Sequence, residues 1–139
     1  MLKYIEQALS TEMIQTLKSS KEEYLLALYY KKNSNKLGDY NLISCKQIGH
    51  GGKNSIDPET ISYNTFIDSY KNLEADSVIL LHNHPSEHKF FNCKVSPSEE
   101  DIAYTVHVFA EYNDINLIDH LIIDKKNYYS FVENGLIEF

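Results

Sequence analysis

Two histidines separated by one residue follow an apolar run in the middle of the chain. The run covers residues 78–81, and the pair is His82 and His84. On a β-strand, residues i and i+2 point to the same side, so both imidazoles should emerge together at the end of a buried strand. Pro85 comes directly after them and ends the pairing of that strand. The pattern is typical of half of a metal site, since catalytic zinc uses three protein ligands and an open position for water.

The third ligand that zinc needs could come from Asp101, downstream of the histidines. Ser98 and Asp101 are spaced as the N-cap and third residue of a helix, a pattern close to a capping box that needs no chemistry. Because this helix start follows the histidines after a loop, it could also hold Asp101 against the metal. Ser98 would then hydrogen-bond a water or a developing oxyanion. The residues therefore predict a zinc hydrolase centre.

Two adjacent carboxylates, Glu22 and Glu23, precede the first apolar strand of the chain. At least one of them is expected to be an ordinary solvated charge at the start of a strand. A zinc hydrolase, however, needs a carboxylate near the metal-bound water, because a general base takes the proton and passes it to the leaving amine. Spacing alone leaves the choice between the two open.

The composition excludes several classes of protein. With 42% hydrophobic and 24% charged residues among 139, the chain is expected to form one globular domain. Its net charge of −7 and the lack of a Lys/Arg cluster count against direct DNA binding. Two cysteines, Cys45 and Cys93, are too few for a disulfide scaffold. We expect no signal peptide and no membrane-spanning segment, and therefore a cytoplasmic location.

Hydrophobic periodicity predicts strands and helices that alternate irregularly around hairpins. Helices are expected over residues 1–19, from Asp57-Pro58 onward, and from Ser98 onward. Strands are expected over residues 24–30, 41–48, 77–82, 116–123 and 128–132. This order predicts an α/β fold for residues 1–139, with a mixed β-sheet and helices packed on it.

The chemistry-bearing residues resemble the JAMM motif of the JAB/MPN metalloprotease superfamily, and most closely its RadC-like bacterial branch. The likeness rests on Glu22 before an apolar strand, residues 82–86 (His-Asn-His-Pro-Ser), and residues 98–101 (Ser-Glu-Glu-Asp). Residues 55–59 and 117–123 also match that branch, and so does the Tyr-Ser-Phe of residues 129–131. The resemblance covers residues 15–135 with several motifs in the same order.

This resemblance implies a single JAB/MPN-like domain with the cytidine-deaminase-like fold and a zinc-dependent activity. His82, His84 and Asp101 would bind Zn²⁺, Glu22 would be the acid/base, and Ser98 would assist at the oxyanion. Glu22 is preferred to Glu23 because it lies two residues before Tyr24, as in the family pattern. The implied reaction is cleavage of an amide bond in a peptide, an isopeptide or a small molecule by a zinc-activated water.

The sequence departs from the RadC-like pattern in two features, and it leaves several questions about function open. Residues 83–97 are expected to form an extended active-site loop, with Glu87 where RadC-like proteins carry glycine. The helical DNA-binding region that full-length RadC proteins also carry is not expected here. The alternatives to a hydrolase are a DNA-repair-associated accessory protein and an inert interaction module. The substrate, the oligomeric state and any support of the metal ligands by Asp119 and His120 stay open.

Overall fold

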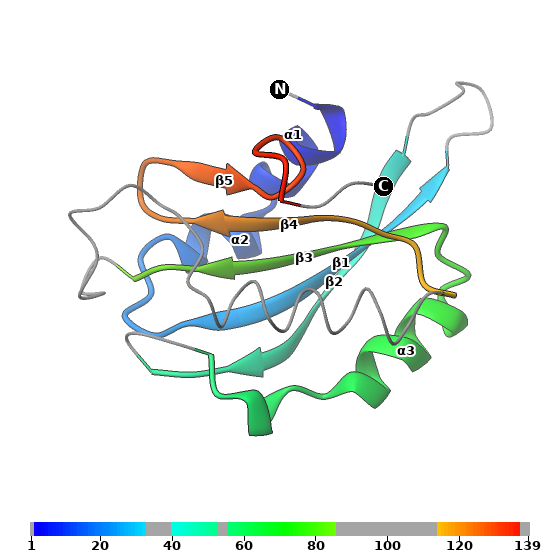
Figure 1. The fold of residues 1–139 in the computed structure, drawn as a ribbon, viewed down its shortest axis with the longest axis horizontal. Helices are drawn as coiled ribbons and strands as arrows, with labels where there is room; N and C mark the ends of the chain where they lie inside the picture. Colours follow the sequence, from blue (N-terminus) through cyan, green and yellow to red (C-terminus); the bar gives the residue numbers. More distant parts are fainter. Residues whose placement is uncertain (1, 33–39, 53–55, 86–113, 137–139) are drawn as a thin grey trace.

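The computed structural model describes residues 2–32, 40–52, 56–85 and 114–136 of the chain. Within these ranges, one sheet has the strand order β2-β1-β3-β4-β5 (Figure 1). Its strands are β1 (Tyr24–Lys32), β2 (Tyr40–His50), β3 (Ser77–Asn83), β4 (Leu117–Ile123) and β5 (Tyr128–Ser130). Strands β3 and β4 run parallel and the other neighbours antiparallel, which confirms the predicted mixed sheet.

The prediction of one N-terminal helix over residues 1–19 is wrong in one respect, because the segment forms two helices. These are α1 (Lys3–Leu9) and α2 (Glu12–Leu17). Between them, the Ser10 hydroxyl donates to the Glu6 carbonyl, and the Thr11 hydroxyl accepts the amide of Ile14 to cap α2. Two consecutive hydroxyl residues thus end one helix and start the next, although the apolar spacing continues through both.

The helix predicted from Asp57-Pro58 begins later than expected. A single 3₁₀ turn, η1 (Pro58–Thr60), comes first, and the Asp57 carboxylate accepts the Glu59 amide there. The α-helix is α3 (Tyr63–Asn72), capped by the Ser62 hydroxyl. In the described part of the chain, no helix has the length and apolar character needed to cross a membrane.

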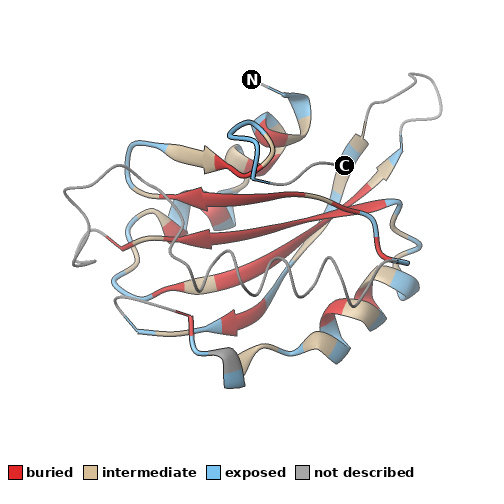
Figure 2. Cartoon of the chain, viewed as in Figure 1, coloured by how far each residue is buried: buried red, intermediate tan, exposed pale blue. Residues whose placement is uncertain are grey.

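The central strands of the sheet, β1, β3 and β4, are buried on both faces, and Figure 2 shows buried residues along almost all of β3 and β4. Helices α1 and α2 cover one face, and α3 packs against the other. The α1–α2 layer contains Ile5, Ala8, Ile14, Leu26, Leu28, Tyr30, Ile79, Leu81, Leu121 and Ile123. The α3 layer contains Leu25, Ala27, Tyr29, Phe66, Val78 and Leu80. Odd-numbered residues of β1 and even-numbered residues of β3 therefore share the α3 face.

An amide side chain from α1 shields one end of the outer edge of β2. Gln7 donates to the Tyr40 carbonyl and accepts the Leu42 amide, both at 2.7 Å. At the other end of β2, the His50 carbonyl accepts the Asp57 amide at 3.0 Å. Unpaired edge groups are templates for unwanted strand pairing, so these contacts protect the edge. The helix expected from Ser98 and most of the loop expected over 83–97 lie outside the described residues.

Candidate metal centre

The two motif histidines lie side by side at the carboxyl end of β3. Their Nε2 atoms are 3.1 Å apart, and their ring centroids are 5.0 Å apart. The His82 side chain is fully buried, and that of His84 is 12% exposed. The period-2 geometry of a strand end thus brings both rings to one face, as the sequence predicts.

A buried carboxylate, that of Glu23, completes the cluster. Its Oε1 lies 3.9 Å from Nε2 of His82 and 3.8 Å from Nε2 of His84. The antiparallel register pairs Leu25 with His82, so the next position on the same face sets Glu23 opposite His84. The backbone of Glu23 is fixed by two hydrogen bonds to the β2 side, to Gly52 at 2.8 Å and from Gly51 at 2.9 Å.

The carboxylate beside the histidines is therefore not the one that the sequence comparison favoured. Glu22 is exposed, whereas Glu23 is buried. Adjacent residues of an extended chain face opposite ways, so only one of the pair can face His82 and His84. The geometry therefore places the carboxylate of Glu23, and not that of Glu22, beside the two histidines.

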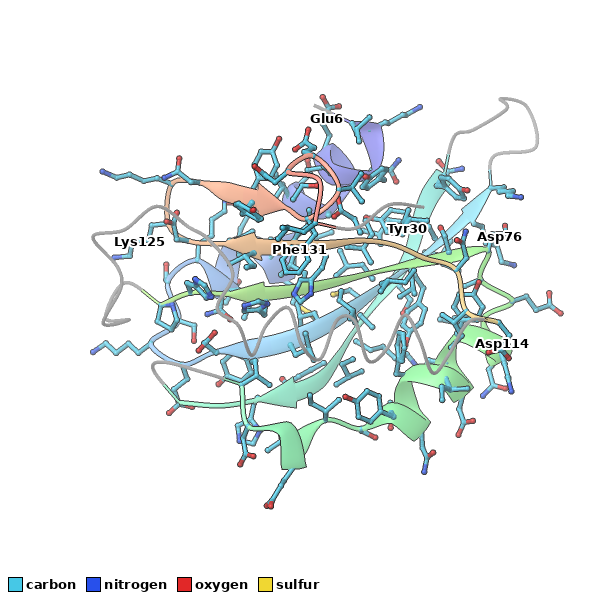
Figure 3. All side chains as sticks on the ribbon, in the orientation of Figure 1. Glu6, Tyr30, Asp76, Asp114, Lys125 and Phe131 are labelled. Carbon is cyan, nitrogen blue, oxygen red and sulfur yellow. The ribbon has the colours of Figure 1, made fainter. Side chains whose placement is uncertain are left out.

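A third histidine, His120 of β4, extends the cluster behind His82. Its Nε2 lies 2.7 Å from Nδ1 of His82, a short hydrogen bond in a fully buried setting. The His120 ring stacks on Phe131 with centroids 4.5 Å apart and planes 12° apart. Phe131 follows β5 and lies beside β4 in Figure 3, and its amide donates to the His120 carbonyl at 3.0 Å. His120 is thus held in place by aromatic packing while it contacts His82.

Asp119 faces the opposite side of the sheet from the histidines and does not join the cluster. Its carboxylate accepts the hydroxyls of Ser130 at 2.6 Å and Tyr4 at 3.2 Å, and the amides of His120 at 2.8 Å and Val132 at 3.1 Å. Burial raises the pKa of Asp119, and these four hydrogen bonds lower it in part. The residue ties α1, β4 and β5 together.

The donor set fits zinc. Two nitrogens bound to one tetrahedral zinc at about 2.05 Å would lie about 3.3 Å apart. The 3.1 Å between the His82 and His84 nitrogens is close to that separation. The ligand atoms of Glu23 and both histidines all lie within 4.8 Å of one another. The Glu23 oxygen is farther from each nitrogen, at 3.9 and 3.8 Å, than the two nitrogens are from each other.

Two residues assigned from the sequence, Ser98 and Asp101, lie outside the described residues. Their roles stay predictions. Two site residues were missed or left open, Glu23 and His120. A signal for His120 exists in the sequence, since it lies in an apolar run next to an acid, yet only the pairing of β4 with β3 shows that it meets His82.

Comparison with known proteins identifies a family and several relatives of this chain. The family model of the RadC-like JAB domain matches residues 5–136 of the chain. A UPF0758 protein of Fusobacterium nucleatum is 43% identical over 68 residues, which cover 48% of this chain and 27% of that protein. A UPF0758 protein of Streptococcus uberis is 30% identical over 125 residues, which cover 88% of this chain and 49% of that protein.

A UPF0758 protein of Streptococcus pyogenes serotype M28 is similar to the same extent. It is 31% identical over 128 residues, which cover 91% of this chain and 50% of that protein. The chain thus spans half or less of the length of these curated relatives. With the family model matching nearly all of the sequence, and a mixed α/β sheet carrying the paired histidines, the chain belongs to the RadC-like JAB domain family.

Proposed function

We propose that the chain is a zinc-dependent hydrolase that cleaves an amide bond in a peptide, an isopeptide or a small molecule. The observation that carries this proposal is the buried cluster of Glu23, His82 and His84, with the two Nε2 atoms 3.1 Å apart. Two imidazoles supply two of the three protein ligands of a hydrolytic zinc site, and a nearby carboxylate on a rigid sheet can serve as its acid/base.

His82 and His84 would hold the metal through Nε2, and Asp101 is the proposed third ligand. Bound zinc would supply a Lewis acid for the scissile carbonyl and lower the pKa of a coordinated water to about 7. His120 would fix the His82 ring, because a hydrogen bond at Nδ1 leaves Nε2 for the metal. In this arrangement, two of the described histidines would bind the metal and the third would hold one of them in place.

Glu23 is the proposed acid/base. Its carboxylate would take a proton as water attacks the carbonyl carbon, and then deliver that proton to the nitrogen as the carbon–nitrogen bond breaks. Burial against two imidazoles keeps the carboxylate at one place through both transfers. Ser98 is the proposed donor to the developing oxyanion.

The test is metal content together with turnover. Purified protein should contain about one zinc per chain by mass spectrometry, and His82→Ala and His84→Ala should lose the metal while keeping the circular dichroism of the fold. Zinc-loaded protein should release the amine from at least one member of a panel of fluorogenic peptides, isopeptide-linked conjugates and simple amides.

Two results would overturn the proposal in different ways. Absence of zinc from correctly folded protein after reconstitution would remove the hydrolytic centre altogether. One bound zinc per chain with no turnover across the panel would favour an interaction module that keeps the metal. Salt-dependent binding of duplex DNA would favour an accessory role in DNA repair, against which the net charge of −7 counts.

A further inference from the structure

The residue between the two histidines, Asn83, directs its side chain to the opposite face of the sheet. It is 1% exposed and makes three hydrogen bonds there. Its Oδ1 accepts the Tyr24 amide at 2.8 Å. Its Nδ2 donates to the Glu22 carbonyl at 2.9 Å and to the Leu17 carbonyl at 3.4 Å. One buried amide therefore joins the end of β3 to the start of β1 and to the end of α2.

These contacts continue the pairing of β1 with β3 beyond its last backbone pair. The register ends at Leu25 and His82, and the next opposed residues are Tyr24 and Asn83. At this point the carboxamide takes the place of a peptide group, since it accepts one hydrogen bond from β1 and donates another to it. An asparagine suits the position because it offers an acceptor and two donors on a short stem.

The two backbone groups that Asn83 holds at the start of β1 belong to the peptide groups on either side of Glu23. The Glu22 carbonyl belongs to the bond before Glu23, and the Tyr24 amide belongs to the bond after it. From the β2 side, the Gly52 carbonyl accepts the amide of Glu23 itself, and the Gly51 amide donates to the Glu23 carbonyl. The backbone of Glu23 is thus held from both neighbouring strands, so little except its side-chain torsions stays free.

We propose that Asn83 is a positioning residue that fixes the Glu23 carboxylate beside His82 and His84. The catalytic consequence rests on the proposed function, but the placement of the carboxylate does not. The motif His-Asn-His then has a task for each residue: two imidazoles on one face hold the metal, and the amide on the other face sets the acid/base.

The test compares Asn83→Ala with Gln7→Ala as a matched control. Gln7 also uses a carboxamide to hold an amide and a carbonyl of one strand, but at the end of β2 that pairs with Lys32, away from Glu23. Both variants should lower the melting temperature. Asn83→Ser, which keeps a smaller hydrogen-bonding group, replaces the alanine variant if the latter does not fold.

The direct readout is the ¹³C NMR resonance of the Glu23 carboxyl, identified by its loss in Glu23→Gln. At one fixed pH this resonance should shift or broaden in the Asn83 variant and stay in place in Gln7→Ala. In zinc-loaded protein, kcat on the amide probe should fall roughly 10–100-fold in the Asn83 variant, because small misplacement of a catalytic group is costly. Zinc content should stay at one per chain, and KM should change little.

The two proposals fail in distinguishable ways. An unchanged Glu23 resonance in the Asn83 variant, or an equal change in Gln7→Ala, would overturn the positioning role whatever the activity. Wild-type protein without zinc or turnover would overturn the proposed function, while the carboxyl resonance would still decide the role of Asn83. If the Asn83 variant loses zinc in proportion to its loss of melting temperature, Asn83 only stabilises the fold, and the inference is overturned.

Discussion

Replacing His120 by phenylalanine should weaken zinc binding without removing a metal ligand. Phenylalanine keeps an aromatic ring to stack on Phe131, but it removes the nitrogen that lies 2.7 Å from Nδ1 of His82. His82 would then lose the contact that fixes its ring and leaves Nε2 for the metal. His120→Gln places an amide near the position of the lost nitrogen and should recover part of the affinity.

The expected size of the effect follows from the contact itself. Removing the partner of a metal-bound histidine typically lowers metal affinity about 10- to 100-fold, or about 1.4 to 2.8 kcal/mol. Because His82 and His120 are both fully buried, water cannot easily replace the lost contact, and we expect the upper half of this range.

The assay is competition for zinc against a chromogenic chelator of known affinity. His50→Phe is the control, because it removes an exposed histidine whose ring packs on Tyr24 outside the cluster. Thermal unfolding of each metal-free variant separates a loss of metal affinity from a loss of fold stability. Zinc affinity in His120→Phe equal to that of the native protein, with an unchanged metal-free melting temperature, would refute the reasoning.

Three further predictions test the site and the fold. Glu23→Gln should reduce turnover by roughly 10²–10⁴-fold with zinc retained, whereas Glu22→Gln should change neither the turnover nor the zinc content. Loss of zinc in Glu23→Gln would instead indicate that Glu23 is a metal ligand. Because burial raises the pKa of Asp119, its carboxyl group stays protonated to a higher pH in the folded state than in the unfolded chain. The free energy of unfolding should therefore fall as the pH rises from about 3.9, the usual pKa of an aspartate, through the raised pKa of Asp119. Urea unfolding of metal-free Asp119→Asn should show a shallower fall, and equal slopes would contradict this. Leu81→Ala, in the buried α1–α2 layer, should cost about 2–5 kcal/mol in urea unfolding, whereas Leu136→Ala, at an exposed position, should cost under about 0.5 kcal/mol.

The paired histidines and the mixed sheet could be predicted because they depend on local signals. An apolar run predicts β3, and period-2 alternation places His82 and His84 on one face. Strands β1 and β2 follow each other in the chain and pair antiparallel, which is also a local arrangement. Helix ends were less predictable, since the hydroxyls of Thr11 and Ser62 cap helices at points that the apolar spacing does not mark.

The choice between Glu22 and Glu23 needed information that β1 does not carry locally. The strand is buried on both faces, so its residues do not alternate between apolar and polar, and neither carboxylate is marked as inward. Which of them faces the histidines is set by the register of β1 against β3, a pairing of residues far apart in the sequence. His120 is similar, because its face depends on the register shift between β3 and β4 at Val78 and Ile79.

The same register explains why the described half of the centre is built on strands rather than loops. Strand β1 runs antiparallel to β3, so it starts where β3 ends, and this pairing brings Glu23 to the side of His84. Strand β4 runs parallel to β3 and sets His120 against the first histidine from the other side. Sites on paired strands hold their geometry more closely than sites on loops. The positions of the Glu23, His84 and His120 side chains are therefore tied to the stability of the sheet. A variant that weakens β1–β3 pairing near Leu25 should disturb the metal centre more than one that weakens this pairing at its far end, near Tyr30.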